Sequence, residues 1–287
     1  MPVNTASLVI GLSYASLLFL VAVGLSVVFG LMRFINLATG SLYLIGGYIG
    51  WSVARSTGNF LLALVAGALA ALVVGIAIER GFLQRLHRKE LLQVALTLGV
   101  AYVVQDVTRW IWGGDPLRLR PPAMLRGSME LFGSVVPIYR VALIVIGAVL
   151  AILVWYLLER TKWGAYVRAG VDDLEMVQCL GINVRRIFAI VFSLGALLSG
   201  LGGALGTPVT GVAPGTDIQL QLMALIVVIL GGLGSVAGAI AASIVVALTD
   251  TIVRTFWPEA SFFAVWALAA AVLIVRPQGL FGRPGWA

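Results

Sequence analysis

The chain has 287 residues, of which 61% are hydrophobic and only 11% are charged, and its formal net charge is +7 at pH 7. A soluble globular domain carries about 25% charged residues, so this composition excludes a chain that covers its own surface in water. Apolar runs of about 20 residues recur, which excludes an outer-membrane barrel of alternating strands and predicts an all-helical integral membrane protein.

Eight apolar runs follow one another and predict a single domain over residues 1–287, a polytopic helical bundle with about eight or nine transmembrane segments. The runs lie at residues 8–31, 42–54, 60–78, 91–112, 137–158, 188–205, 219–254 and 261–275. No basic segment precedes the first run, so we expect a retained span there and not a cleaved signal peptide. The run at 42–54 is short for a crossing, and we expect it to be tilted, broken or re-entrant.

The remaining runs carry three further signals. Asp106 and Arg109 share a helix face and are expected to be able to pair. The run at 188–205 has small residues at helical spacing, which lets helix backbones approach closely. The segment 207–217 has no basic residue and is interpreted as an outer loop, and the run at 219–254 is expected to form two segments that meet at LGGLGS.

Two glycine-rich interruptions, MRFINLATGSLYLIGGY at 32–48 and LGGLGSVAGA at 230–239, lie near the two ends of the chain. Broken helices in two halves indicate a transport site, because unwound backbone is tolerated in a bilayer only beside a cavity or inside protein. The alternative is that these glycines only permit close packing. The candidate translocation-path residues are Asn36, Thr39, Ser41, Tyr43, Gly231, Gly232 and Gly234.

A polar segment at 163–187, WGAYVRAGVDDLEMVQCLGINVRRI, separates two apolar runs. Leu174, Val177 and Leu180 form an imperfect apolar stripe that predicts a short amphipathic helix, which Gly181 ends. Such a helix either lies on the lipid interface or receives a soluble partner. The distribution of the 19 Lys and Arg residues places this segment and the C-terminus in the cytoplasm and the N-terminus outside, rather than indicating nucleic-acid binding.

Motifs for chemistry are missing from the sequence. There is no G-x-x-x-x-G-K-[ST] loop, no H-E-x-x-H and no nucleophile with a base, so we expect neither an enzyme nor a cofactor. The single cysteine, Cys179, and the single histidine, His87, leave no disulfide and no metal cluster. Few carboxylates lie inside the spans, which argues against a stand-alone secondary transporter that couples to an ion.

Four stretches, at residues 30–48, 163–187, 224–243 and 275–282, resemble the permease subunits of branched-chain amino acid ABC importers of the high-affinity leucine/isoleucine/valine type. The resemblance covers nearly the whole chain. It implies a multi-pass protein of the bacterial inner membrane that pairs with a second homologous permease subunit. It also implies two cytoplasmic ATP-binding subunits and a periplasmic substrate-binding protein.

The resemblance also implies that residues 168–182 contact the ATP-binding subunit. The residues assigned to this ATPase-coupling contact are Arg168, Asp172, Asp173, Glu175, Leu180, Gly181 and Ile182. One departure concerns the solute: relatives commonly show N-x-A-H-G-E where this chain has Asn-Leu-Ala-Thr-Gly-Ser at 36–41. Branched-chain amino acids are therefore the expected cargo, and urea, short amides or other small polar solutes are the alternative.

Overall fold

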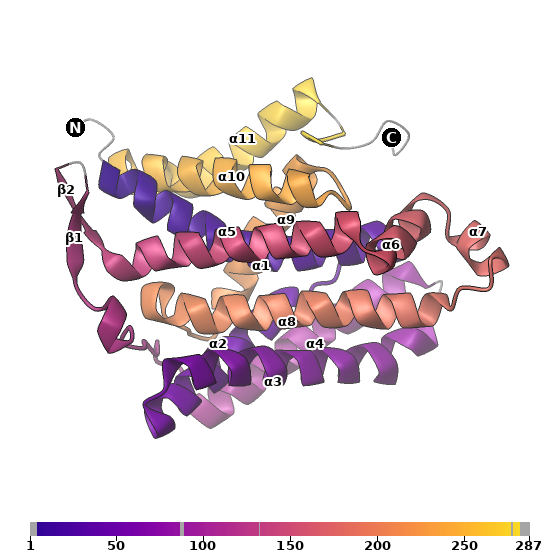
Figure 1. Ribbon diagram of the computed structural model, residues 1–287, viewed down its shortest axis with the longest axis horizontal. Helices are drawn as coiled ribbons and strands as arrows, with labels where there is room; N and C mark the ends of the chain where they lie inside the picture. The colour runs from indigo at the N-terminus through magenta and orange to yellow at the C-terminus, as the bar shows by residue number, and fades with distance from the viewer. Residues whose placement is uncertain (1–4, 87–88, 132, 277, 282–287) are drawn as a thin grey trace.

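The computed structural model describes residues 5–86, 89–131, 133–276 and 278–281. Within these ranges the chain is a bundle of α-helices with one small β-hairpin (Figure 1). The helices are α1 (Thr5–Met32), α2 (Thr39–Thr57), α3 (Phe60–Gly81), α4 (Glu90–Trp112), α5 (Ile138–Arg160), α6 (Lys162–Asp172), α7 (Leu174–Cys179), α8 (Val184–Thr210), α9 (Thr216–Gly231), α10 (Val236–Phe256) and α11 (Ser261–Val275). Strands β1 (Ser128–Leu131) and β2 (Ser134–Pro137) pair antiparallel, and 3-10 turns lie at Leu83–Leu86, Ala123–Leu125 and Pro258–Ala260.

Six helices of the described chain are long and apolar enough to cross a membrane: α1, α3 with the turn that follows it, α4, α5, α8 and α10. Helices α9 and α11 are apolar but shorter. The expected all-helical, polytopic fold is therefore confirmed, whereas the number of eight or nine crossings stays a prediction. Of the residues used above, His87, Pro277 and residue 282 lie outside the described residues.

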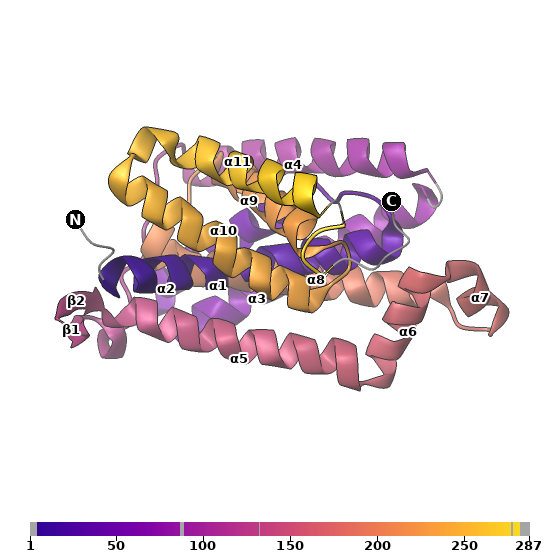
Figure 2. The ribbon, with the colours of Figure 1, turned by 90° about the horizontal axis from the view of Figure 1, so that it is seen from above.

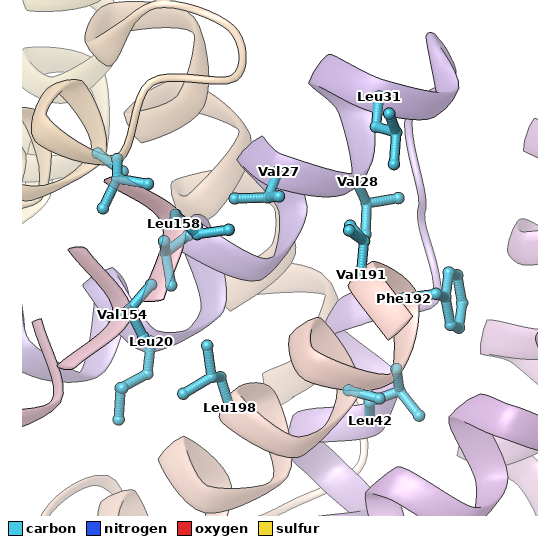
Figure 3. Packing of buried hydrophobic residues seen from close by; sticks show 14 of the residues in the cluster. Leu20, Val27, Val28, Leu31, Leu42, Val154, Leu158, Val191, Phe192 and Leu198 are labelled. Atoms are coloured by element: carbon cyan, nitrogen blue, oxygen red, sulfur yellow. The ribbon is translucent and has the colours of Figure 1, made fainter. Parts of the chain in front are cut away.

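Helix α1 forms the centre of the bundle, because it is apolar on all sides and contacts α5, α8, α9 and α10. Figure 3 shows its side chains packed between those of neighbouring helices. The labelled residues are Leu20, Val27, Val28 and Leu31 of α1, Leu42 of α2, Val154 and Leu158 of α5, and Val191, Phe192 and Leu198 of α8.

Small residues bring α8 against three neighbouring helices, as the sequence predicts. A Cβ added at Gly24 of α1 would lie 2.8 Å from the Cα of Gly195 in α8. A Cβ at Gly46 of α2 would overlap the backbone of Gly200, and Gly200 in turn lies against α3. Backbones that approach this closely leave no room for larger side chains, so these glycines set the spacing of α1, α2, α3 and α8.

Three expectations are wrong. The run at 42–54 is neither broken nor re-entrant, because α2 is one continuous helix of 19 residues whose glycines pack against other helices. The segment 207–217 is not an open loop: α8 continues to Thr210, and α9 begins at Thr216 with Asp217 only 2% exposed. Asp106 and Arg109 are both exposed, and no ion pair joins them within the described ranges.

The two ends of the bundle differ in character. Helices α6 and α7 project from one end, and the start of α1 lies at the opposite end together with the β-hairpin (Figures 1 and 2). The turn between α9 and α10 lies at the α7 end, since Gly234 contacts Gly30 of α1 and Val171 of α6. The expected pair of segments meeting at LGGLGS is thereby confirmed.

Candidate functional site

The chain between α1 and α2 turns back into the bundle without helical structure. Arg33 adopts a positive φ of 56°, a conformation that non-glycine residues rarely take, and this sharply redirects the chain. Phe34, Asn36 and Ala38 are all buried. The break that the sequence predicts therefore lies at residues 33–38, immediately before α2.

This segment delivers the first turn of α2 to the first turns of α9. The Gly40 N–H donates to Oε1 of Gln221 at 2.8 Å, and Nε2 of Gln221 donates to the Asn36 carbonyl at 3.0 Å. The Ser41 hydroxyl donates to Oδ2 of Asp217 at 3.4 Å. Gly40 is required here, because a Cβ would overlap the Asp217 carbonyl oxygen. We call the group formed by Asn36, Thr39, Gly40, Ser41, Asp217 and Gln221 the polar junction.

The polar junction is closed to solvent, with each of its side chains at most 6% exposed. Figure 1 shows α9 behind α1, near the middle of the long axis of the molecule. Two helix N-termini, each a source of partial positive charge and free N–H groups, thus meet inside an apolar bundle. Polar groups at such a depth usually mark a solute or ion pathway.

Asp217 is the junction residue that sequence reasoning missed. Its Oδ1 accepts a hydrogen bond from the Gly215 N–H at 3.1 Å, and it stands in the first turn of α9, where a carboxylate interacts favourably with the helix dipole. An acidic residue directly after a Pro-Gly turn and before an apolar run is a helix-start signal, which was available in APGTD.

The other path candidates lie elsewhere. Tyr43 is 1% exposed and its hydroxyl is 3.4 Å from Oγ1 of Thr210, so it packs against α8. Gly231 lies against Gly238 of α10, and Gly232 and Gly234 have positive φ values in the turn between α9 and α10. The second glycine-rich stretch therefore builds a tight turn at the α7 end and does not join the polar junction.

A cavity of about 550 Å³ opens at the α7 end. Its polar lining comes from Arg33, Glu90, Gln93, Asp172, Asp173, Glu175 and Gln178. About one turn beyond Gln93 on α4, Oγ1 of Thr97 accepts a hydrogen bond from the Leu37 N–H at 3.2 Å. The buried polar face of α4 thus leads from this cavity, which we call the α7 cavity, to the segment that precedes the polar junction.

The coupling segment, residues 163–187, folds into α6, α7 and the start of α8. The Asp173 carboxylate caps α7 by accepting from the N–H groups of Glu175 and Met176, both at 3.0 Å. Val177 is buried, and Gly181 has a φ of +77° after the last turn. The expected short amphipathic helix with a glycine stop is therefore present.

The coupling residues divide into three groups. Asp172, Asp173 and Glu175 line the α7 cavity. Leu180 is 69% exposed, Gly181 is exposed and Ile182 is half-buried. Arg168 is held inside the chain, because it pairs with Glu159 at 3.4 Å and donates to the Leu158 carbonyl.

Met176, which sequence reasoning did not single out, is 59% exposed on the same short helix as Glu175. A metal site is not formed: in the part of the chain that the structure describes, no three His, Cys, Asp or Glu side chains are grouped to hold a metal ion.

Comparison with known proteins places these features. Residues 7–276 match the family model described as branched-chain amino acid transport system / permease component. The high-affinity branched-chain amino acid transport system permease protein LivH of Escherichia coli K12 is 26% identical over 96% of this chain and 94% of its own length. BraD of Pseudomonas aeruginosa, with the same description, is 26% identical over 96% and 95%. The ribose import permease protein RbsC of Escherichia coli K12 is 28% identical over 76% and 67%. No solved structure gives a significant match.

Proposed function

This chain belongs to the family of branched-chain amino acid transport permease components, and from that premise we propose that it carries a branched-chain amino acid through the polar junction. As a permease of an ABC transport system it works with separate ATP-binding subunits and a substrate-binding protein. A second homologous permease subunit completes the pathway. The observation that carries the proposal is a closed cluster of polar side chains between two helix N-termini inside an apolar bundle.

The proposed route has a defined inner half. It runs from the polar junction along the buried polar side chains Gln93 and Thr97 of α4 to the α7 cavity. The cavity shares residues with the coupling segment, so movement of α7 changes the shape of the exit. This supports a mechanism of alternating access in which the ATP-binding subunits act on α7.

The docking surface for the ATP-binding subunit consists of Met176, Leu180 and Gly181. The two large apolar side chains are exposed at the tip of a short helix that projects from the bundle. An exposed Met and Leu beside a polar rim suit burial against a partner protein. The end that carries α7 is cytoplasmic in this proposal, and the N-terminus and the β-hairpin face the other side of the inner membrane.

Urea or a short amide is the alternative cargo, because the polar junction offers hydroxyl and amide groups that bind such solutes equally well. Uptake of radiolabelled leucine, urea, acetamide and ribose by the assembled transporter in liposomes, with its binding protein inside or outside, separates these cargoes. Uptake of leucine alone supports the proposal, and uptake of another solute without leucine contradicts it.

The docking proposal is tested by Met176→Ser combined with Leu180→Ser. We expect leucine uptake to fall at least about tenfold, since removing two anchor side chains typically costs more than 1 kcal/mol each. Met124→Ser is the matched control, because Met124 is 95% exposed near the β-hairpin. Unchanged uptake and ATP hydrolysis in the α7 double variant would place the ATP-binding subunit elsewhere.

A further inference from the structure

We propose that the polar junction contains a recognition site for a primary ammonium group, formed by the Asp217 carboxylate and the hydroxyls of Ser41 and Tyr48. This inference rests on the proposed function in one respect, namely that the junction lies on the solute pathway. It adds which chemical group of the solute is bound, and by which atoms.

Asp217 is a buried acceptor with capacity left over. Within the described ranges no Lys or Arg side chain forms an ion pair with it. Its Oδ1 is occupied by the Gly215 N–H, whereas Oδ2 has only the long 3.4 Å contact with Ser41. A carboxylate removed from water is costly unless a cation or several donors compensate it. A monovalent cation at Oδ2 would supply this compensation.

Tyr48 provides an independent sign of a missing partner. Its side chain is 0% exposed, and its hydroxyl has no hydrogen-bond partner among the described residues. Its ring stacks on Trp112 with centroids 5.0 Å apart, which fixes its position. A buried hydroxyl without a partner is uncommon, because leaving it unpaired costs about 1–3 kcal/mol.

The hydroxyl of Tyr48 is directed toward the polar junction. Tyr48 lies about two turns after Ser41, so both side chains leave the same face of α2. Aromatic side chains on helices lean toward the N-terminus, which brings the phenol back toward Ser41. The phenol lies within the range of the electrostatic field of Asp217. An ammonium group has three N–H donors, and these three side chains offer three acceptors.

The surroundings favour a cation over an anion. The charged residues that line the α7 cavity include Glu90, Asp172, Asp173 and Glu175 but one cation, Arg33. Carboxylates along a pathway attract cations and repel anions. A purely structural role for Asp217 as a cap of α9 explains the bond to Gly215, but it leaves the unpaired Tyr48 hydroxyl unexplained.

The test uses charged thiol reagents on the assembled transporter in liposomes during ATP hydrolysis. Cys179→Ser removes the only native cysteine, and Ser41→Cys adds a reporter beside Asp217. The probes are aminoethyl methanethiosulfonate, a primary ammonium, and sulfonatoethyl methanethiosulfonate, an anion. Rates are normalised to those of Ser128→Cys, an exposed site on the β-hairpin.

We expect the ammonium reagent to react at position 41 at least about tenfold faster than the sulfonate, because one nearby charge in a medium of low dielectric constant has an effect of that size. Adding Asp217→Asn should remove the preference while leaving the rates at position 128 unchanged. Tyr48→Phe, which keeps the ring, should reduce the preference about threefold, as expected for one hydrogen bond.

Two results are separable. Reaction at position 41 with no preference for the ammonium reagent overturns the recognition site and leaves the proposed pathway intact. Failure of both reagents to reach position 41 in a transporter that still moves solute overturns the pathway, and the recognition site with it. If Asp217→Asn does not assemble, the Tyr48→Phe variant alone decides, since an unchanged preference contradicts the proposal.

Discussion

The contact between Ser41 and Asp217 shows how one residue constrains another across 176 positions of sequence. Ser41 is 1% exposed and its hydroxyl meets a carboxylate that is 2% exposed. A small neutral donor suits this position, whereas the pattern common among relatives has Glu there. In this chain a Glu at position 41 would bring a second negative charge against Asp217.

We therefore predict that Ser41→Glu destabilises the protein by about 3 kcal/mol, the usual penalty for a buried charge without a partner. Adding Asp217→Asn should restore much of the loss, because the carboxylate at 41 would then meet an amide donor. The midpoint of thermal unfolding of the purified transporter, followed by size-exclusion chromatography, measures both variants. Strictly additive effects of the two substitutions would show that the side chains are not coupled.

Sequence reasoning identified half of the polar junction. Asn36, Thr39 and Ser41 were predicted because they interrupt a run of apolar residues, which is a local signal. Asp217 and Gln221 were not, because their place in the fold depends on α9 starting inside the bundle and not at its surface. A polar residue near a turn looks the same in sequence whether the turn is exposed or enclosed.

At the scale of helices, glycine spacing decides which elements meet. A Cβ at Gly203 of α8 would overlap the carbonyl oxygen of Tyr43 in α2 and lie 2.8 Å from the Gly47 nitrogen. These atoms belong to backbone, so neither helix can yield locally. Gly99 of α4, in contrast, has nothing within 4 Å of an added Cβ.

Gly203→Ala is accordingly expected to cost about 2 kcal/mol, a typical penalty for overpacking, and to lower leucine uptake by displacing α2. The matched control is Gly99→Ala, which should change stability by less than about 0.5 kcal/mol because it meets open space. Denaturation of the transporter in detergent compares the two. Equal behaviour of the variants would mean that α2 and α8 are farther apart than their backbones indicate.

The prediction of elements from sequence succeeded for long spans and failed for short or glycine-rich ones. Helix α2 was expected to be short or broken because glycines weaken isolated helices, but in this bundle they serve as contact points for α3 and α8. The β-hairpin at 128–137 was not predicted, since its two strands have four residues each and lie in a polar loop.

For the whole molecule, the two ends of the bundle have to face different compartments. The native thiol of Cys179 is exposed on α7, and Ser128 is exposed on the hairpin at the opposite end (Figure 1). The excess of basic residues near the α7 end argues for a cytoplasmic α7, because positively charged segments are retained on that side. The sequence supports this orientation only weakly, since the loop at 113–136 is also rich in arginine.

A pair of labelling variants decides the orientation. In spheroplasts, a membrane-impermeant maleimide should leave Cys179 of the native chain unmodified and should modify Ser128→Cys in a Cys179→Ser background. After the membrane is permeabilised, both thiols should react, which shows that each is sterically accessible. Labelling of Cys179 in intact spheroplasts would put α7 outside, where no ATP-binding subunit reaches it, so the coupling role of α7 would be lost. The polar junction would remain a solute pathway in either orientation, because its closure inside the bundle does not depend on which end faces the cytoplasm.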